Sequence, residues 1–80
     1  MNQILADAVI MAISNQKGLD PSSIGLNSSL SELGVSSLDA ISIAYVIEDR
    51  FDIEVPNEML ADLKSVHDIV DKLSTLITAP

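Results

Sequence analysis

The sequence predicts an all-α protein: a small four-helix bundle with three longer helices and one short one, formed by residues 1–80 as a single domain. Apolar residues recur at helical spacing in three segments of the chain. A chain of 80 residues is near the lower size limit for one hydrophobic core. Although 48% of the residues are hydrophobic, only Tyr45 and Phe51 are aromatic, so the core is expected to be mostly aliphatic. The sequence contains no cysteine, which excludes disulfides and thiolate metal sites.

The first helix is expected over about residues 2–15, and Gly18 and Pro21 are expected to end it. Its predicted buried face contains Ile4, Leu5, Ala8, Val9 and Ala12, and is widened by Ile10, Met11 and Ile13. Residues 16–36 form a connection rich in Ser, Asn and Gly that is long for a compact domain. We expect a short helical turn at Ser29–Leu33 and four apolar side chains that hold the connection on the core: Ile24, Leu26, Leu30 and Leu33.

The second helix is expected from Ser37 to about Arg50. Ser36 is a favourable N-cap, and Asp39, three residues later, completes a capping-box pattern. The carboxylate of Asp39 also lies near the positive end of the helix dipole. The predicted buried face consists of Ala40, Ile43, Ala44, Ile47 and Phe51.

After this helix, residues 52–56 are expected to be extended, because the residue before Pro56 avoids the helical region. A single strand has no pairing partner, so we predict a loop that buries Ile53 and Val55. A short third helix is expected at about Asn57–Asp62. Its expected anchors on the core are Met59, Leu60 and Leu63.

The last helix, expected at about Val66–Ile77, has the clearest helical pattern in the chain. Ser65 and Asp68 form a second capping-box pattern at its start. Residues 78–80 are expected to be a frayed tail. The predicted buried face consists of Val66, Ile69, Val70, Leu73, Leu76 and Ile77.

The chain is strongly acidic, with 12 acidic and 4 basic residues and a net charge of −8. Such a surface repels nucleic acids and anionic lipids and attracts proteins with basic surfaces. The simpler interpretation is that the charge only keeps the protein soluble. No segment has the length of a membrane span, and no basic start precedes the first apolar run as in a signal peptide. A cytoplasmic monomer is the default expectation.

Ser37 is the leading candidate functional residue because it stands where a glycine-containing loop gives way to a helix. The free N–H groups and the dipole at that end of a helix favour an attached anion such as a phosphate. No catalytic base is near in sequence, so we expect another protein to modify this hydroxyl and expect the chain itself not to be an enzyme. A Ser37–His67–Asp triad is far less probable than a chance co-occurrence. The acidic residues match no calcium loop, and no metal site is expected.

Two stretches, LGVSSLD at 33–39 and IEDRFDIEVP at 47–56, closely resemble the acyl carrier protein family. The resemblance extends over the whole chain, including the long first loop and the acidic second helix. It implies that Ser37 carries a 4′-phosphopantetheine arm, installed from coenzyme A by a separate transferase with Mg²⁺. The thiol of the arm would hold acyl groups as thioesters and pass them between enzymes of fatty-acid or polyketide-type biosynthesis.

The chain departs from the family pattern at two positions. Ser36 stands where such carriers usually have Asp, and Ser42 stands where they often have an acidic residue. Ser36 retains the capping role, so the departures point to a specialised carrier with its own partners and leave the fold prediction unchanged. Of the two adjacent serines, Ser37 aligns with the family's modified residue.

The second helix also presents a candidate docking face for partner enzymes, on the side opposite the core. Its predicted members are Leu38, Asp39, Ser42, Tyr45, Glu48 and Asp49. The acidic members would pair with basic residues of the phosphopantetheinyl transferase and of acyl-transferring and synthase enzymes. The alternative is that Glu48 and Asp49 are an ordinary solvated helix end and that Tyr45 is a half-buried core aromatic.

Two other functions remain open from the sequence: a peptidyl or aminoacyl carrier, and an unmodified acidic interaction domain. An acyl cargo would be held between the helices. Its candidate lining residues are Ile43, Ile47, Met59 and Leu63, although simple core packing explains them equally well.

Overall fold

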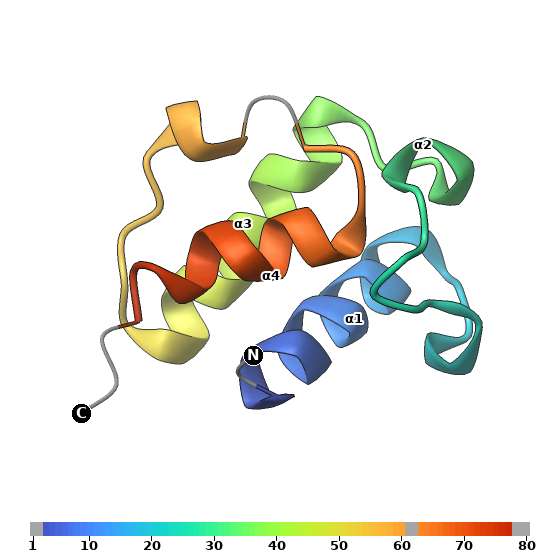
Figure 1. Cartoon of the computed structure of the whole chain (residues 1–80), viewed down its shortest axis with the longest axis horizontal. Helices are drawn as coiled ribbons and strands as arrows, with labels where there is room; N and C mark the ends of the chain where they lie inside the picture. Colours follow the sequence, from blue (N-terminus) through green and yellow to red (C-terminus); the bar gives the residue numbers. More distant parts are fainter. Residues whose placement is uncertain (1–2, 61–62, 78–80) are drawn as a thin grey trace.

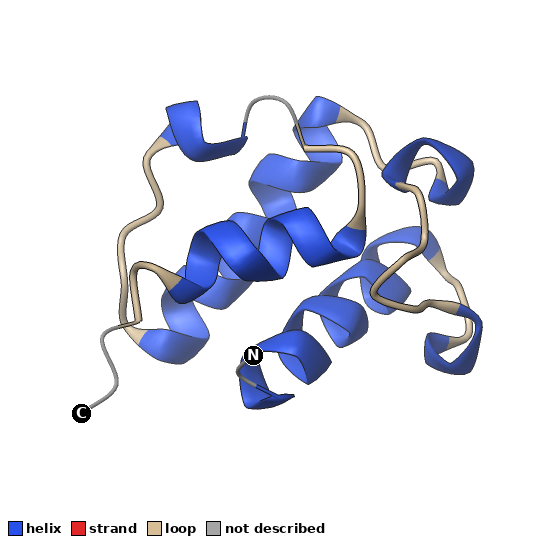
Figure 2. Ribbon diagram, viewed as in Figure 1, coloured by secondary structure: helices blue, strands red, loops and turns tan. Residues whose placement is uncertain are grey.

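The computed structural model describes residues 3–60 and 63–77. These residues form helical segments joined by loops, and this part of the chain contains no strand (Figure 2). The elements are α1 (Gln3–Lys17), the 3₁₀ turn η1 (Pro21–Ser23), α2 (Leu30–Leu33), α3 (Ser37–Phe51), the 3₁₀ turn η2 (Asn57–Leu60) and α4 (Val66–Ser74). The predicted all-α fold with three longer helices is therefore confirmed.

Helix α1 packs against both α3 and α4 (Figure 1). Its buried residues are Leu5, Ala6, Ala8, Val9, Ala12, Ile13 and Ser14. The predicted burial of Ile4 and Met11 was wrong, because these side chains are 70% and 45% exposed. Both lie on the same side of the helix as the exposed Asp7, three and four residues away, and this side faces away from α3 and α4. The apolar stripe of α1 is thus narrower than its composition indicates.

Helix α3 begins with the predicted capping box at Ser36 and Asp39. The Asp39 N–H donates to Ser36 Oγ at 3.2 Å, and the Ser36 N–H donates to Asp39 Oδ2 at 3.0 Å. These bonds satisfy N–H groups that have no partner inside the helix. Of the predicted core face, Phe51 is partly buried and the other four residues are buried. These four are Ala40, Ile43, Ala44 and Ile47.

Helix α4 also begins with its predicted capping box, at Ser65 and Asp68, but it ends at Ser74 instead of near Ile77. The hydroxyls of Ser74 and Thr75 donate to the carbonyls of Asp71 and Lys72, each at 2.7 Å. Side-chain bonds of this kind compete with continuation of the helix. The predicted tail at 78–80 lies outside the described residues.

The long connection between α1 and α3 contains η1, which the sequence did not predict, and α2 at the predicted turn. Ile24 and Leu30 are buried, as expected for residues that hold a loop on the core. The connection also pairs with the segment before α4 through an isolated bridge between Ser29 and Ser65. The Leu30 N–H donates to the Lys64 carbonyl at 2.9 Å and the Val66 N–H donates to the Ser28 carbonyl at 3.1 Å. Main-chain pairing thus satisfies polar groups of a loop that packs on the core.

The short third helix predicted at Asn57–Asp62 is a 3₁₀ turn over Asn57–Leu60, and residues 61–62 lie outside the described range. Its anchors are confirmed, since Met59, Leu60 and Leu63 pack partly buried against the core. In the loop before it, Val55 is buried and Ile53 is partly buried, as predicted. The core is aliphatic throughout, with Leu5, Ile13, Ile43, Ile47 and Leu73 as its largest fully buried side chains.

Candidate functional site

Ser37 is the first residue of α3, and its side chain is exposed. The chain reaches this position through Gly34, which ends α2 in the left-handed conformation with a φ of 75°. Glycine adopts this conformation without the steric cost that a Cβ imposes. The Val35 N–H then donates to the Leu30 carbonyl at 2.9 Å. The turn at Gly34 therefore directs the chain into α3 with Ser37 at the surface.

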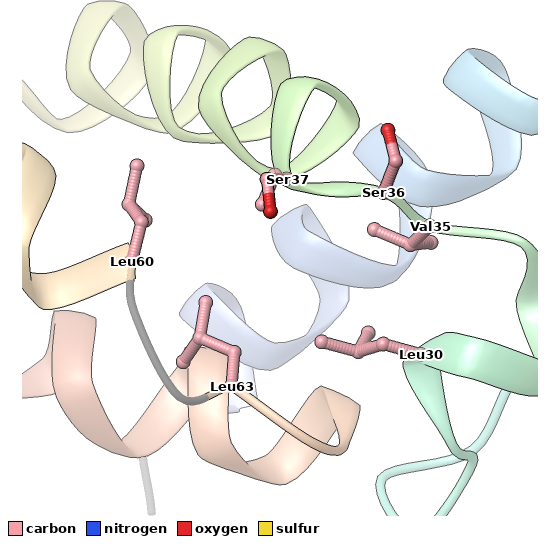
Figure 3. A pocket seen from close by; sticks show the side chains of 7 residues that line it. Leu30, Val35, Ser36, Ser37, Leu60 and Leu63 are labelled. Carbon is pink, nitrogen blue, oxygen red and sulfur yellow. The ribbon is translucent and has the colours of Figure 1, made fainter.

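The two adjacent serines have different environments. Ser36 Oγ accepts the Asp39 N–H and donates to Asp39 Oδ2, both at 3.2 Å. Ser37 Oγ, by contrast, makes no hydrogen bond to any residue in the described part of the chain. Figure 3 shows the Ser37 hydroxyl directed toward a pocket and the Ser36 hydroxyl directed away from it. Of these two serines, only Ser37 presents a hydroxyl without a capping bond to the described residues.

Asp39 belongs to a polar network that joins two helices. Its carboxylate accepts the backbone N–H of Ser36, the side-chain amide of Gln16 at 3.1 Å and the ammonium of Lys17 at 3.0 Å. These donors stabilise the charged carboxylate. The Ser36 N–H foremost, and then Gln16 and Lys17, hold the pKa of Asp39 well below its usual range.

A small cavity of about 130 Å³ opens beside Ser37. Its lining residues come from α2, the loop that follows it, the start of α3, η2 and the segment before α4. They are Leu30, Val35, Ser36, Ser37, Ala40, Leu60 and Leu63 (Figure 3). Of the four residues predicted to line a cargo pocket, Leu63 lines this cavity. Ile43 and Ile47 are instead fully buried in the core, at 1% and 0% exposure, and Met59 packs against it. The cavity therefore lies closer to the start of α3 than predicted.

The outer face of α3 is apolar near Ser37 and acidic toward its end. Leu38 and Tyr45 are 76% and 63% exposed, which rules out the interpretation of Tyr45 as a half-buried core residue. Asp49 is exposed and Ser42 is partly buried. Glu48 is partly buried, and its Oε2 accepts the Val55 N–H at 3.0 Å. Two acidic members of the predicted docking face, Asp39 and Glu48, thus also hold the fold together.

Sequence reasoning missed several residues of the site. Val46, 51% exposed beside Tyr45, extends the apolar part of the outer face, and its outward position on the helical repeat was the available signal. Gln16 and Lys17 reach Asp39 from α1, and no sequence pattern indicates that contact. Four lining residues of the cavity were also not predicted as such: Leu30, Val35, Ala40 and Leu60.

Residues 3–60 and 63–77 can also be compared with the sequence-based statements on a catalytic triad, a metal site and a membrane span. His67 is exposed, and no hydrogen bond joins it to Ser37 in these residues. Here no three His, Cys, Asp or Glu side chains are arranged to hold a metal ion. The helices of this part are also too short or too polar to cross a membrane.

Comparison with known proteins gives consistent matches. A family model described as a phosphopantetheine attachment site matches residues 7–73. An acyl carrier protein of Clostridium acetobutylicum is 38% identical over 60 residues, which is 74% of this chain and 78% of that protein. An acyl carrier protein of Thermosynechococcus vestitus is 30% identical over 81 residues, covering 99% of this chain and 100% of that protein.

The fold and the site thus define a small helical carrier domain that presents a serine hydroxyl at a helix start. The chain belongs to the acyl carrier protein family. It is accordingly a carrier and not an enzyme, and the family match implies a covalently attached 4′-phosphopantetheine group. The site fits such a group, because Ser37 offers an exposed hydroxyl next to an open cavity, and no residue in the described part of the chain forms a hydrogen bond with it. A carrier of this kind interacts with the transferase that loads it and the synthase enzymes that use it.

Proposed function

We propose that Ser37 is the attachment residue and that its Oγ becomes the bridging oxygen of a phosphodiester to 4′-phosphopantetheine. A separate transferase would bind coenzyme A, and Ser37 Oγ would attack the phosphorus that bears the pantetheine. As the new O–P bond forms, the P–O bond of the pyrophosphate would break with 3′,5′-ADP as the leaving group, and the hydroxyl proton would pass to a base of the transferase. The single observation that carries this assignment is the difference between the serines. Ser36 Oγ is committed to the cap of α3, whereas Ser37 Oγ is exposed and unbonded within the described residues. The start of α3 also favours the negative phosphodiester.

The proposed cargo is an acyl group, held as a thioester on the thiol of the arm for fatty-acid or polyketide-type biosynthesis. The relatives are named acyl carrier proteins. The described residues that line the cavity beside Ser37 are Leu, Val, Ala and Ser, and within this described lining no carboxylate would pair with the ammonium of an aminoacyl cargo. The cavity is small, about 130 Å³, and its mainly aliphatic lining suits an apolar part of an acyl chain.

The proposed docking surface for partner enzymes is the outer face of α3, from Leu38 and Asp39 through Ser42 and Tyr45 to Glu48 and Asp49. Leu38 and Tyr45 supply exposed apolar contacts. The charged end of the helix and the net charge of −8 favour enzymes with basic surfaces, including the transferase. Ion pairs of this kind speed association and are screened by salt, which suits a carrier that must also leave each enzyme quickly. A cytoplasmic location and a monomeric state remain predictions.

The attachment is tested by intact mass after incubation with coenzyme A, Mg²⁺ and a broad-specificity phosphopantetheinyl transferase. We expect the wild type and the matched control Ser36→Ala to gain one phosphopantetheine, and Ser37→Ala to gain none. Modification of Ser37→Ala, or its loss in Ser36→Ala alone, would transfer the assignment to Ser36. No gain with the protein's own transferase, under conditions that modify another carrier, would refute the proposal and favour an unmodified interaction domain.

A further inference from the structure

We propose that Lys17, supported by Gln16, is a positioning residue for the chemistry at Ser37. Both residues lie in the last turn of α1, far from Ser37 in sequence. Their side chains fix the first turn of α3 and the loop before it. The kinetic part of this inference rests on the proposed role of Ser37.

The first observation is the shared carboxylate of Asp39. It accepts the Ser36 N–H at 3.0 Å from its own helix start, and it accepts Lys17 Nζ at 3.0 Å and Gln16 Nε2 at 3.1 Å from α1. The Lys17 and Asp39 side chains are only 28% and 18% exposed. An ion pair that is partly shielded and shares its carboxylate with other donors holds its geometry better than a solvated surface pair. The cap of α3 is thereby tied to the end of α1.

The second observation is the position of Lys17 beside Gly34. A Cβ built on Gly34 would lie 3.7 Å from Lys17 Cε, an ordinary van der Waals separation. The end of the Lys17 side chain thus lies close to the left-handed turn that ends α2, while its ammonium donates to Asp39. One side chain therefore lies beside Gly34 and bonds Asp39, the two ends of the segment 34–39, and Ser37 lies between them.

These contacts matter because Ser37 has no side-chain bond of its own within the described residues. The direction of its hydroxyl depends on its backbone, which lies at a helix end, where helices fray. A reacting oxygen displaced by even a fraction of an ångström leaves the near-attack geometry and slows bond formation. Lys17 acts on this geometry through Asp39 and Gly34 without contacting the substrate itself.

The kinetic test compares Lys17→Met, which keeps an unbranched apolar side chain of similar length and removes the ammonium, with Lys17→Arg, which restores a cation. Lys64→Met, which removes an exposed lysine outside this network, is the matched charge control. Phosphopantetheine transfer is measured with one transferase well below the unfolding temperature of each variant. We expect Lys17→Met to lower kcat about fivefold with little change in KM, and Lys17→Arg to restore most of it. Lys64→Met should match the wild type.

A second measurement does not depend on modification. Amide hydrogen exchange at Asp39 and Ala40 reports the order of the first turn of α3, and we expect about fivefold faster exchange in Lys17→Met. If the wild type accepts no phosphopantetheine, the proposed function fails, and the exchange measurement alone decides on the positioning role. The inference would be overturned by unchanged amide exchange in Lys17→Met, or by an unchanged kcat when the wild type accepts phosphopantetheine. An effect confined to KM and abolished by salt would also overturn it.

Discussion

Replacing Ser36 and Ser37 one at a time by alanine separates the structural serine from the functional one. In Ser36→Ala the Asp39 N–H loses its acceptor, and the bond from Ser36 Oγ to Asp39 Oδ2 is lost as well. The bond from the Ser36 backbone N–H to Asp39 Oδ2 remains, because it does not use the replaced side chain. Ser37→Ala removes a hydroxyl that makes no hydrogen bond in the described part of the chain.

The expected magnitudes differ clearly. Removing a serine N-cap costs about 1 kcal/mol, and we expect that value for Ser36→Ala because half of its capping box survives. For a domain of this size, a loss of 1 kcal/mol lowers the unfolding temperature by about 4–8 °C. Ser37→Ala should change the stability by less than about 0.5 kcal/mol, since alanine is a good helix former and no bond is lost.

Thermal unfolding followed by circular dichroism measures both variants, with Ser36→Thr as a control that retains a capping hydroxyl. We expect Ser36→Ala to be less stable and still modified, and Ser37→Ala to be stable and unmodified. Equal unfolding temperatures for Ser36→Ala and the wild type would refute the reasoning. So would a Ser37→Ala variant that is clearly the less stable of the two.

Three further outcomes are expected. Glu48→Ala leaves the Val55 N–H without its acceptor and should lower the free energy of unfolding, measured in urea, by about 1–3 kcal/mol. The control Asp49→Ala should change this free energy by less than about 0.5 kcal/mol. Equal losses in the two variants would contradict the role of Glu48. The pKa of Asp39 is lowered in the folded state, mainly by the Ser36 N–H, so its contribution is present above the unfolded value of about 4 and is lost as the pH falls below it. The stability difference between wild type and Asp39→Asn should therefore shrink below about pH 4, and a difference independent of pH would argue against this linkage. Because the net charge is −8, adding Mg²⁺ should raise the unfolding temperature, and a decrease would show that repulsion does not limit stability.

Local patterns predicted most of the helices because their causes are local. Each capping box lies within four consecutive residues, and the buried faces of α3 and α4 follow from helical spacing alone. The same reasoning failed for Ile4 and Met11, because the width of a buried face depends on how many neighbours cover the helix. The elements that cover α1 are α3, α4 and η1, and Ile4 and Met11 lie exposed on another side of the helix.

The candidate site was likewise predictable where its cause is local and not where it depends on how the helices pack. Ser37 was predictable, since a loop that ends at a helix start is visible in the sequence. The contact between Lys17 and Asp39 was not predictable, because 22 residues separate them and it depends on where α1 ends and how it packs on α3. The cavity was misplaced for a similar reason: Ile43 and Ile47 have the spacing of lining residues, but α1 and the rest of the core cover them.

The pairing between the long connection and the segment before α4 determines how the cavity beside Ser37 can widen. Leu30, which lines the cavity, donates its N–H to the carbonyl of Lys64, the residue next to Leu63, which also lines it. Separating these two segments would break a main-chain hydrogen bond, whereas Leu60 belongs to a short 3₁₀ turn whose apolar side chains pack partly buried on the core. Under the proposed function, a longer acyl chain in this cavity would gain room by displacing η2 outward, and the anchoring of that turn would then set the length of chain that fits.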